Sequence, residues 1–276
     1  MNVRRDTLTK KIILYFLLAI AIIVYAYPLY FVITTALKTN MDSLASPPKF
    51  IFKPTLQSFK NSFANYDLFP SLLNSIIVSF SNMALTLAAG VPAAYSLSRA
   101  NFKGKKLLSF WILTSRMIPP IVMVIPFFII SRATGLYDKH IFLIFIYLTI
   151  NLAFVVWMMK SFFDDIPISL DEAAMVDGCS PIGAFYKVIL PLTVPGLIST
   201  AIFCLMFTWN EFMYALTLTE YYASTLPITF SKFLGYTSIS WAELSAAALT
   251  TMLPILIAAA LVQKNIVKGL TVGAVK

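Results

Sequence analysis

Residues 12–37 read IILYFLLAIAIIVYAYPLYFVITTAL, a run of 26 residues without a charged side chain. A helix needs about 20 mostly apolar residues to cross a hydrocarbon core about 30 Å thick. The run follows Arg4, Arg5, Lys10 and Lys11, but it is too long for a signal peptide and has no small-x-small cleavage site at its end. The stretch therefore predicts a retained membrane-spanning helix, and a membrane protein around it.

The composition of the whole chain supports a membrane protein. Of 276 residues, 59% are hydrophobic and 12% are charged, against roughly 45–50% and about 25% in soluble domains. The mean hydropathy is +0.82, and so few charged residues cannot cover that much apolar surface. The net charge of +9 does not indicate a nucleic-acid partner, because the basic residues flank apolar runs, as membrane topology places them.

Five further runs are long and apolar enough to cross a bilayer, and lipid offers no partner for unpaired backbone groups, so each is read as a helix. The sequence predicts an all-α polytopic membrane protein with six transmembrane helices. The predicted spans are Ile12–Leu37, Ser71–Ser98, Leu107–Ser131, Ile141–Met159, Pro191–Asn210 and Leu244–Val262.

The distribution of Lys and Arg predicts the orientation. With a cytoplasmic N-terminus, the inner segments hold 13 of these residues and the outer segments hold 7, while Arg116 lies within a span. An excess in the short inner loops favours that orientation, so we expect both termini in the cytoplasm. Cys179 and Cys204 then lie on the inner side and inside a span, which argues against a disulfide.

The inner connection at residues 160–190 is patterned like folded structure. Ser169 and Glu172 have the spacing of a capping box before a short helix, Leu170–Val176. Gly178 suits a left-handed stop, and Ser180 followed by Pro181 suits the start of a second helix. This helix, Ile182–Leu190, is predicted to place Ile182, Phe185, Tyr186 and Ile189 on one face and to end at Pro191.

This helix–turn–helix has two interpretations. It could be an interfacial pair that packs beneath the bundle, or it could be a docking element for a cytoplasmic partner. Nearly half of the 12 acidic residues lie in the loop, and anionic headgroups repel carboxylates, which favours docking. These residues are Asp164, Asp165, Asp171, Glu172 and Asp177.

The loop resembles the EAA loop of ABC importer permeases. The shared pattern is Glu172-Ala173-Ala174, three residues, Gly178, nine residues, and then Val188-Ile189-Leu190-Pro191, where Val188 replaces Ile. The resemblance implies that the loop is the element that sits in a cleft of the ATPase subunit, with the Glu contacting a basic residue there. It assigns ATPase coupling to Asp171, Glu172, Ala173, Ala174, Asp177, Gly178 and Pro191.

The rest of the chain is similar to the smaller, maltose-type permease of the carbohydrate-uptake family. The similar stretches are Asn74-Ser75, Arg99 before Phe102-Lys103-Gly104-Lys105, Met117-Ile118-Pro119 with Pro126, Trp209-Asn210, and residues 269–276. In that family the C-terminal tail reaches the ATPase subunits, which implies such contacts for Gly269 and Gly273. The implied division is a cytoplasmic N-terminus with the first span at 1–37, an external loop at 38–70, a permease core at 71–263 with its coupling loop at 160–191, and a cytoplasmic tail at 264–276.

The resemblance implies a permease that moves a sugar or sugar derivative across the inner membrane of a prokaryotic cell. The implied partners are a second homologous permease subunit, a dimer of ATPase subunits that binds ATP and Mg²⁺, an extracytoplasmic solute-binding protein, and membrane lipid. No phosphate-binding Gly-x-x-x-x-Gly-Lys-Ser/Thr loop occurs, so we expect the ATPase to be a separate chain and this chain to carry no cofactor.

Other functions are less well supported by the residues. An enzyme is not expected, because His140 is the single histidine and no metal-binding spacing occurs. A self-contained secondary transporter is the alternative, but it predicts intramembrane carboxylates and internal repeats. Glu211 and Glu243 lie near span ends, and no convincing half-to-half repeat is present.

Polar groups inside spans are costly, so each is a candidate for the translocation pathway. Arg116 could donate to sugar hydroxyls, or it could pair with a carboxylate, a helix-end carbonyl or the partner subunit. Asn82 and Asn151 could bind sugar or join helices. Asn210 and Glu211 could line an external gate or lie at the wet interface, and Trp209, Phe212 and Tyr214 could stack on a sugar ring or form an interfacial belt.

Two features of the spans concern their shape. Pro119, Pro120 and Pro126 must interrupt the hydrogen bonds of the third span, which makes it either a pathway wall or a static kink. Gly90 with Ala94, and Ala89 with Ala93, provide small faces for close helix packing in the second span.

Overall fold

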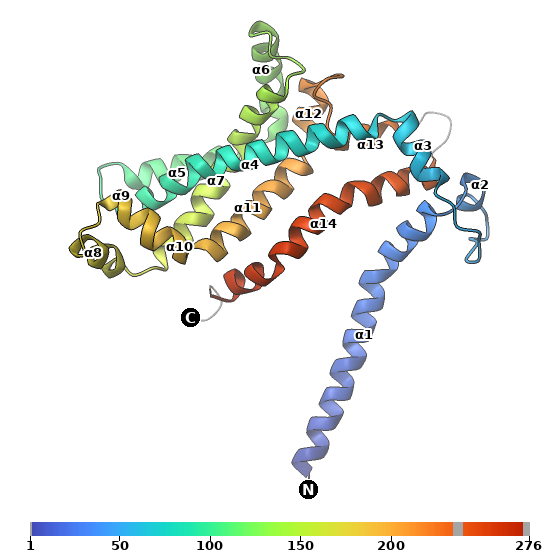
Figure 1. The fold of residues 1–276 in the computed structure, drawn as a ribbon, viewed down its shortest axis with the longest axis horizontal. Helices are drawn as coiled ribbons and strands as arrows, with labels where there is room; N and C mark the ends of the chain where they lie inside the picture. Colours follow the sequence, from blue (N-terminus) through green and yellow to red (C-terminus); the bar gives the residue numbers. More distant parts are fainter. Residues whose placement is uncertain (1, 234–239, 273–276) are drawn as a thin grey trace. The chain divides into compact units, whose positions relative to one another are not determined.

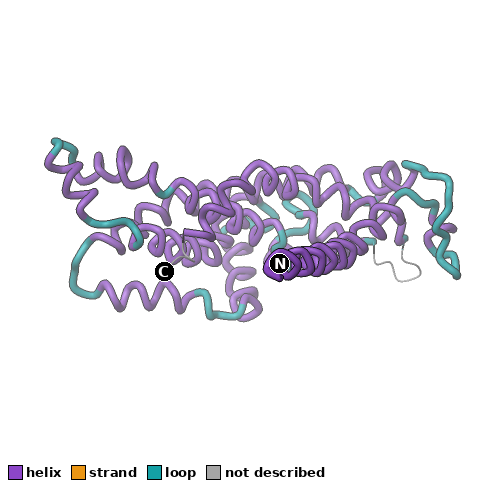
Figure 2. The backbone as a smooth tube through the Cα atoms, turned by 90° about the horizontal axis from the view of Figure 1, so that it is seen from below, coloured by secondary structure: helices purple, strands orange, loops and turns teal. Residues whose placement is uncertain are grey.

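The computed structural model describes the backbone of residues 2–233 and 240–272 and the side chains of residues 10–233 and 240–260. All regular structure in this part of the chain is helical (Figure 2). The helices, labelled in Figure 1, are α1 (Asn2–Ala36), α2 (Asn40–Ser43), α3 (Gln57–Asn65), α4 (Leu68–Arg99), α5 (Lys105–Ser115), α6 (Pro120–Ala133), α7 (His140–Asp164), α8 (Ser169–Val176), α9 (Pro181–Ala184), a π-helical turn η1 (Phe185–Ile189), α10 (Leu190–Leu192), α11 (Val194–Trp209), α12 (Met213–Leu218), α13 (Leu226–Lys232) and α14 (Trp241–Val272).

Among the residues that the structure describes, four helices are long and apolar enough to cross a membrane by themselves: α1 from Lys10, α4, α7, and α14 as far as Ala260. The chain divides into two compact units, residues 1–68 with 230–252 and residues 69–229 with 253–276.

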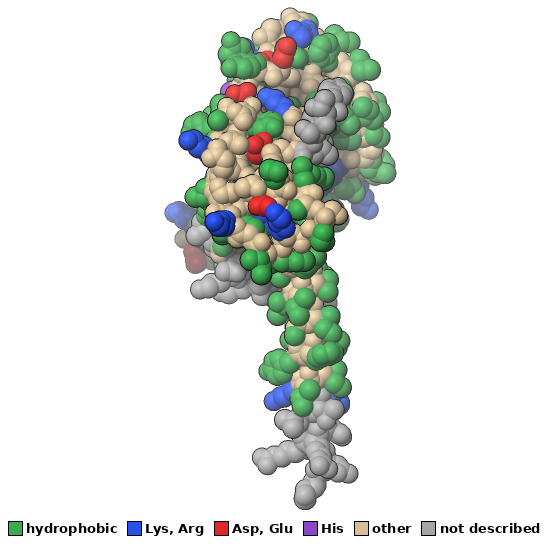
Figure 3. Space-filling view, turned by 90° about the vertical axis from the view of Figure 1, so that its right-hand side faces the viewer, with side chains coloured by type: hydrophobic (Ala, Val, Ile, Leu, Met, Phe, Trp, Pro, Cys, Tyr) green, Lys and Arg blue, Asp and Glu red, His purple; other side chains and the backbone are tan. Residues whose placement is uncertain are grey.

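In the first unit, α1 has an apolar surface on all sides. None of the side chains in its apolar window, within Lys10–Ala36, is buried, and hydrophobic side chains cover the face of this helix that Figure 3 shows. A helix that is apolar all round is stable when lipid or another protein surrounds it. Elsewhere in this unit, α3 is tied to the start of α14, because Asn61 Nδ2 donates to Glu243 Oε1 (2.9 Å) and Ser62 Oγ donates to the Glu243 carbonyl (2.9 Å).

The second unit is built around α4, a helix of 32 residues that is therefore about 48 Å long. Its C-terminal half packs on α7 and η1 through a buried apolar cluster that includes Val91, Leu97, Val155 and Ile189. The predicted small face is confirmed at Gly90, where a Cβ atom would lie 2.7 Å from Val155 Cγ1. The close approach of α4 and α7 therefore requires a glycine at this position.

The third predicted span is not one straight helix. Helices α5 and α6 meet at an angle of 88°, because Pro119 is extended (ψ 132°) and neither Pro119 nor Pro120 has an N–H to continue the ladder. Pro126, in contrast, lies inside the continuous helix α6. The proline pair therefore ends one helix and begins the next, whereas the missing N–H of Pro126 interrupts the ladder within a helix that continues.

The last two predicted spans also differ in their limits. Helix α11 has 16 residues and begins at Val194, because the chain turns at Thr193 after the short helix α10. Helix α14 continues to Val272, so residues 264–272 of the expected tail are helical, and their place in the cytoplasm stays a prediction.

Candidate functional site

The loop singled out in the sequence forms a hairpin of two helical arms, which we call the coupling hairpin and define as residues 169–192. Its arms, α8 and α9–α10, are bent by 120°. The predicted turn is confirmed, because Gly178 has a φ of +89°, a conformation that suits glycine. The predicted second start is also confirmed, because Ser180 Oγ accepts from the Gly183 N–H (3.1 Å) and Pro181 is the first residue of α9.

Two details of the predicted hairpin are wrong. Ser169 is the first residue of α8 and no side chain caps this helix, so the capping box is absent: the preceding residue, Ile168, already has helical backbone angles. The predicted apolar face is divided, because Phe185 and Ile189 are buried whereas Ile182 and Tyr186 are exposed. The π-helical turn η1 lies in this segment, and its register differs from the regular α-helix that the prediction assumed.

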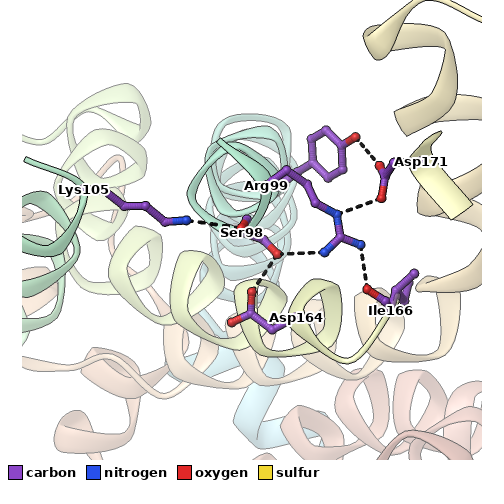
Figure 4. Close-up of polar contacts among 7 residues, drawn as sticks. Ser98, Arg99, Lys105, Asp164, Ile166 and Asp171 are labelled. Carbon is purple, nitrogen blue, oxygen red and sulfur yellow. Dashed lines mark hydrogen bonds and ion pairs between the residues drawn. The ribbon is translucent and has the colours of Figure 1, made fainter. Parts of the chain in front are cut away.

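The two neighbouring carboxylates of α8 lie in opposite environments. Glu172 is exposed, whereas Asp171 is buried and its Oδ2 atom lies 2.8 Å from Arg99 Nε at the end of α4. The Tyr95 hydroxyl donates to the other oxygen, Oδ1, at 2.5 Å. Figure 4 shows Arg99 reaching from α4 to both Asp171 and the Ile166 carbonyl.

The remaining residues assigned to ATPase coupling lie mainly on the outside of the hairpin. Ala173, Asp177, Gly178 and Pro191 are exposed, whereas Ala174 is buried. Large apolar side chains are exposed beside them, notably Val176 at 87% and Ile182 at 71%. An apolar surface of this kind with a neighbouring carboxylate is typical of a protein contact.

Sequence reasoning missed a second anchored segment, at the Leu68 end of α4. Asp138, in the loop before α7, has a φ of +57°, and its carboxylate accepts from four consecutive backbone N–H groups, those of residues 220–223, at 2.9–3.1 Å. Burial favours the neutral acid, but the four N–H groups stabilise the carboxylate more and hold the pKa of Asp138 below its usual value. A lone Asp in a loop gives no sequence signal of such a role.

Helix α4 holds the same segment. Asn74 Nδ2 donates to the carbonyls of Tyr222 and Ser224, both at 2.9 Å, and the Leu226 N–H donates to Ser75 Oγ at 2.9 Å. His140 Nε2 lies 2.7 Å from Asn74 Oδ1, which explains the position of the single histidine. Helix α4 is therefore hydrogen-bonded to the coupling hairpin at one end and to residues 220–226 at the other.

The two intramembrane asparagines meet. Asn151 Nδ2 on α7 donates to Asn82 Oδ1 on α4 and to Thr208 Oγ1 on α11, both at 2.7 Å, and Asn82 Nδ2 donates to the Ile144 carbonyl at 2.8 Å. All three side chains are buried. The amides therefore join three helices, as one of the two interpretations predicted, and any role in translocation stays a prediction.

Arg116 lies at the bend between α5 and α6, where it is the C-cap of α5. Its guanidinium carbon is 5.0 Å from the ring centroid of Phe154 and 4.9 Å from that of Phe207, within the range of a cation–π interaction. The side chain is exposed, so contact with a solute or a partner subunit stays open.

The aromatic and polar residues at the end of α11 are divided between core and surface. Trp209 and Tyr214 are buried, at 6% and 3% exposure. Asn210 is exposed and donates to the Met206 carbonyl (2.8 Å). Glu211 accepts from the Tyr147 hydroxyl (2.8 Å) and from the N–H groups of Tyr214 and Ala215, so it holds the start of α12. A gating role for these residues stays a prediction.

Of the two glycines assigned to tail contacts, Gly269 is part of α14 and Gly273 lies outside the described residues.

The fold and hairpin define a class, that of a helical multi-pass membrane protein with a helical hairpin bonded to one end of α4. The chain belongs to the family described as the binding-protein-dependent transport system inner membrane component, whose model matches residues 86–272.

Relatives with assigned names cover almost the whole chain. A probable ABC transporter permease protein of Sinorhizobium fredii is 34% identical and covers 97% of this chain and 96% of its own. The trehalose/maltose permease protein of Thermococcus litoralis is 34% identical over 99% of each chain. The sulfoquinovosyl glycerol permease protein of Agrobacterium fabrum is 34% identical over 91% of this chain and 88% of its own.

A solved structure supports the fold. A chain of a bacterial ABC transporter that imports the acidic polysaccharide alginate superposes with a TM-score of 0.77, covering 94% of this chain and 97% of its own at 20% identity. The chain is therefore a permease with the fold of ABC importer permeases.

Proposed function

We propose that this permease carries a sugar or sugar derivative inward across a prokaryotic inner membrane. A separate ATPase that binds the coupling hairpin drives the transport. The observation that supports it best is the division of α8, in which Glu172 faces outward while Asp171 is held inside. Sugar transport is supported by relatives named for trehalose, maltose and diacetylchitobiose.

The expected partners bind this chain at different positions. An ATPase dimer binds ATP and Mg²⁺ and contacts the hairpin through Glu172, Val176 and Ile182. A second, related permease subunit completes the pathway, and an extracytoplasmic solute-binding protein delivers the solute. Both termini lie in the cytoplasm, lipid surrounds the spans, and this chain catalyses no reaction itself.

In the proposed transport cycle, each hairpin moves as a rigid element together with the ATPase subunit that binds it. ATP binding closes the ATPase dimer and moves the two hairpins that it holds, and the bundles change between inward-open and outward-open states. The polar residues Asn82, Arg116, Asn151, Trp209, Asn210 and Glu211 remain our candidates for contact with the pathway or for control of its shape.

Replacement of Glu172 tests the proposal. Glu172→Ala removes an exposed charge and no contact that the fold uses, so we expect normal membrane abundance and loss of uptake. The measurement is uptake by the native host of radiolabelled trehalose, maltose, diacetylchitobiose and sulfoquinovosyl glycerol, with membrane abundance measured by immunoblot.

Glu220→Ala is the matched control, because Glu220 is also exposed and lies outside the hairpin. We expect it to retain uptake. Near-normal uptake by the Glu172 variant, or uptake by the wild-type chain in vesicles that contain no ATPase and no ATP, would contradict the proposed function.

A further inference from the structure

Asp171 is a buried charge within an otherwise exposed docking element. Its side chain is 8% exposed and that of Arg99 is 12% exposed, and both oxygens of the carboxylate have a partner, Arg99 Nε on one and the Tyr95 hydroxyl on the other (Figure 4). Because the carboxylate is buried and bonded inside the fold, it is poorly placed to contact an ATPase subunit. Its part in coupling must differ from that of the neighbouring Glu172.

The last turn of α4 holds more than Asp171. Arg99 Nη2 donates to the Ile166 carbonyl at 2.9 Å, and Ser98 Oγ donates to Asp164 Oδ1 at 2.6 Å. The Tyr95 ring lies 4.6 Å from that of Phe185 in the second arm of the hairpin. One turn of α4 thus contacts the segment before the hairpin and both of its arms.

The attachment of α8 depends on charge more than the attachment of the second arm does. The two buried residues of α8 are Asp171 and Ala174, whereas the second arm buries Phe185 and Ile189 in the apolar cluster shared with α4 and α7. Helix α8 also packs on α9 and η1, and the side-chain hydrogen bonds of Asp171 to Tyr95 and Arg99 tie it to α4.

We propose that Tyr95, Arg99 and Asp171 form a transmission joint, in which they are positioning residues that make α8 move together with the second span. The inference rests on the proposed function, because it assumes that an ATPase moves the hairpin. The joint separates two properties: Glu172 and the exposed apolar side chains let the ATPase dock, and the joint converts the movement of the docked hairpin into movement of α4.

Disruption of the joint should uncouple solute transport from ATP hydrolysis without preventing the ATPase from docking. Breaking a buried ion pair leaves an uncompensated charge in a poorly solvated place, and α8 then changes its direction while its outer surface stays intact. The ATPase should still bind and hydrolyse ATP, but fewer solute molecules should cross per ATP. Coupling free energies between sites correspond to about 5- to 150-fold effects, and we expect a loss in that range.

The test is a comparison of Asp171→Asn with Glu172→Ala in the complete transporter, purified from its native host and reconstituted in vesicles. Asp171→Asn keeps the size of the side chain and removes its charge. Co-purification of the ATPase, ATP hydrolysis and solute uptake are measured for each variant. We expect Asp171→Asn to retain the ATPase and to show a 5- to 150-fold fall in solute carried per ATP, whereas Glu172→Ala loses the ATPase or its activity.

Three further variants keep the test decisive if Asp171→Asn does not reach the membrane. Arg99→Lys can still pair with Asp171 but cannot also reach the Ile166 carbonyl, since a lysine carries a single compact charge, so a smaller fall is expected. Tyr95→Phe removes one bond and leaves the ion pair, and it should also give a smaller fall. Lys49→Gln removes an ion pair with Asp42, outside the coupling loop, and is the control that should leave the ratio unchanged.

The possible results separate the two proposals. Normal uptake per ATP in Asp171→Asn, Arg99→Lys and Tyr95→Phe would overturn the joint and leave the importer function standing. Loss of ATPase co-purification in Asp171→Asn, equal to that in Glu172→Ala, would show that Asp171 is a docking residue and would also overturn the joint. A wild-type chain that purifies without an ATPase and transports alone would overturn the proposed function itself.

Discussion

At the scale of single residues, substitution can show whether the buried amides in the middle of the bundle act in helix packing or in transport. Asn82 bonds with residues of both α7 and α11, because it donates to the Ile144 carbonyl and accepts from Asn151 and Thr208. Hydrogen bonds between helices in membranes have a mean near 0.6 kcal/mol each, with a maximum near 1.7. An amide with several such bonds is first a packing residue, whatever it does in transport.

Replacing Asn82 measures this role. Asn82→Ala leaves the Asn151 amide with fewer partners inside the bundle, and we expect a loss of about 1–3 kcal/mol in the free energy of unfolding. The midpoint of thermal unfolding in detergent measures it, with exposed Asn210→Ala as a control that should change little. Unchanged stability together with altered solute preference would instead make Asn82 a pathway residue.

At the scale of elements, the segment between α12 and α13 owes its shape to a carboxylate far away in the sequence. Four backbone N–H groups in residues 220–223 point at Asp138, which leaves Tyr221 and Tyr222 exposed at 73% and 69%. Such a loop is held in one conformation by charge-assisted bonds. Its conformation therefore depends on the protonation of one side chain.

This dependence predicts the effect of pH. The N–H groups lower the pKa of Asp138 in the folded protein, so the stabilisation is complete above the unfolded pKa of about 3.9 and is lost as pH falls through the lower folded pKa. Asp138→Asn should destabilise the protein at pH 7, and it should abolish this part of the acid sensitivity. Thermal unfolding of both proteins between pH 7 and pH 3 measures it, and parallel curves would contradict the role.

At the scale of the whole molecule, the anchored segments at the two ends of α4 imply opposite membrane surfaces. Helix α4 is about 48 Å long, longer than a hydrocarbon core of about 30 Å, so we expect its two ends to lie outside the core on different sides. The coupling hairpin is bonded at the Arg99 end and residues 220–226 at the other. We expect the hairpin in the cytoplasm and residues 220–226 outside.

Cysteine labelling tests this arrangement. Tyr186→Cys and Tyr221→Cys place thiols at exposed positions of the two segments, in a chain whose Cys179 and Cys204 are replaced by Ser and Ala. A membrane-impermeant maleimide should label Tyr221→Cys in right-side-out vesicles and Tyr186→Cys in inverted vesicles. Labelling of both from one side would contradict the topology.

The sequence contains information about local structure, namely which segments are helical and where the chain turns. The apolar runs predicted helices because a span of about 20 apolar residues satisfies its own backbone hydrogen bonds in lipid as a helix. Gly178, Ser180 and Pro181 predicted the hairpin turn because each acts on its own backbone. Errors arose where a helix could begin one residue earlier, at Ser169, or change its register, at residues 185–189. Local propensity is a weak preference that tertiary contacts override.

The sequence by itself determined the apolar, helical character of the spans, the interruption at Pro119–Pro120 and the presence of the EAA loop. Only the tertiary structure decided which of two adjacent carboxylates, Asp171 or Glu172, faces inward, and that Asp138 organises a segment more than 80 residues away in the chain. The physical reason is the distance along the chain over which each effect acts. Hydropathy and backbone preference act within a few residues, whereas the partner of a buried charge is fixed by the packing of distant helices.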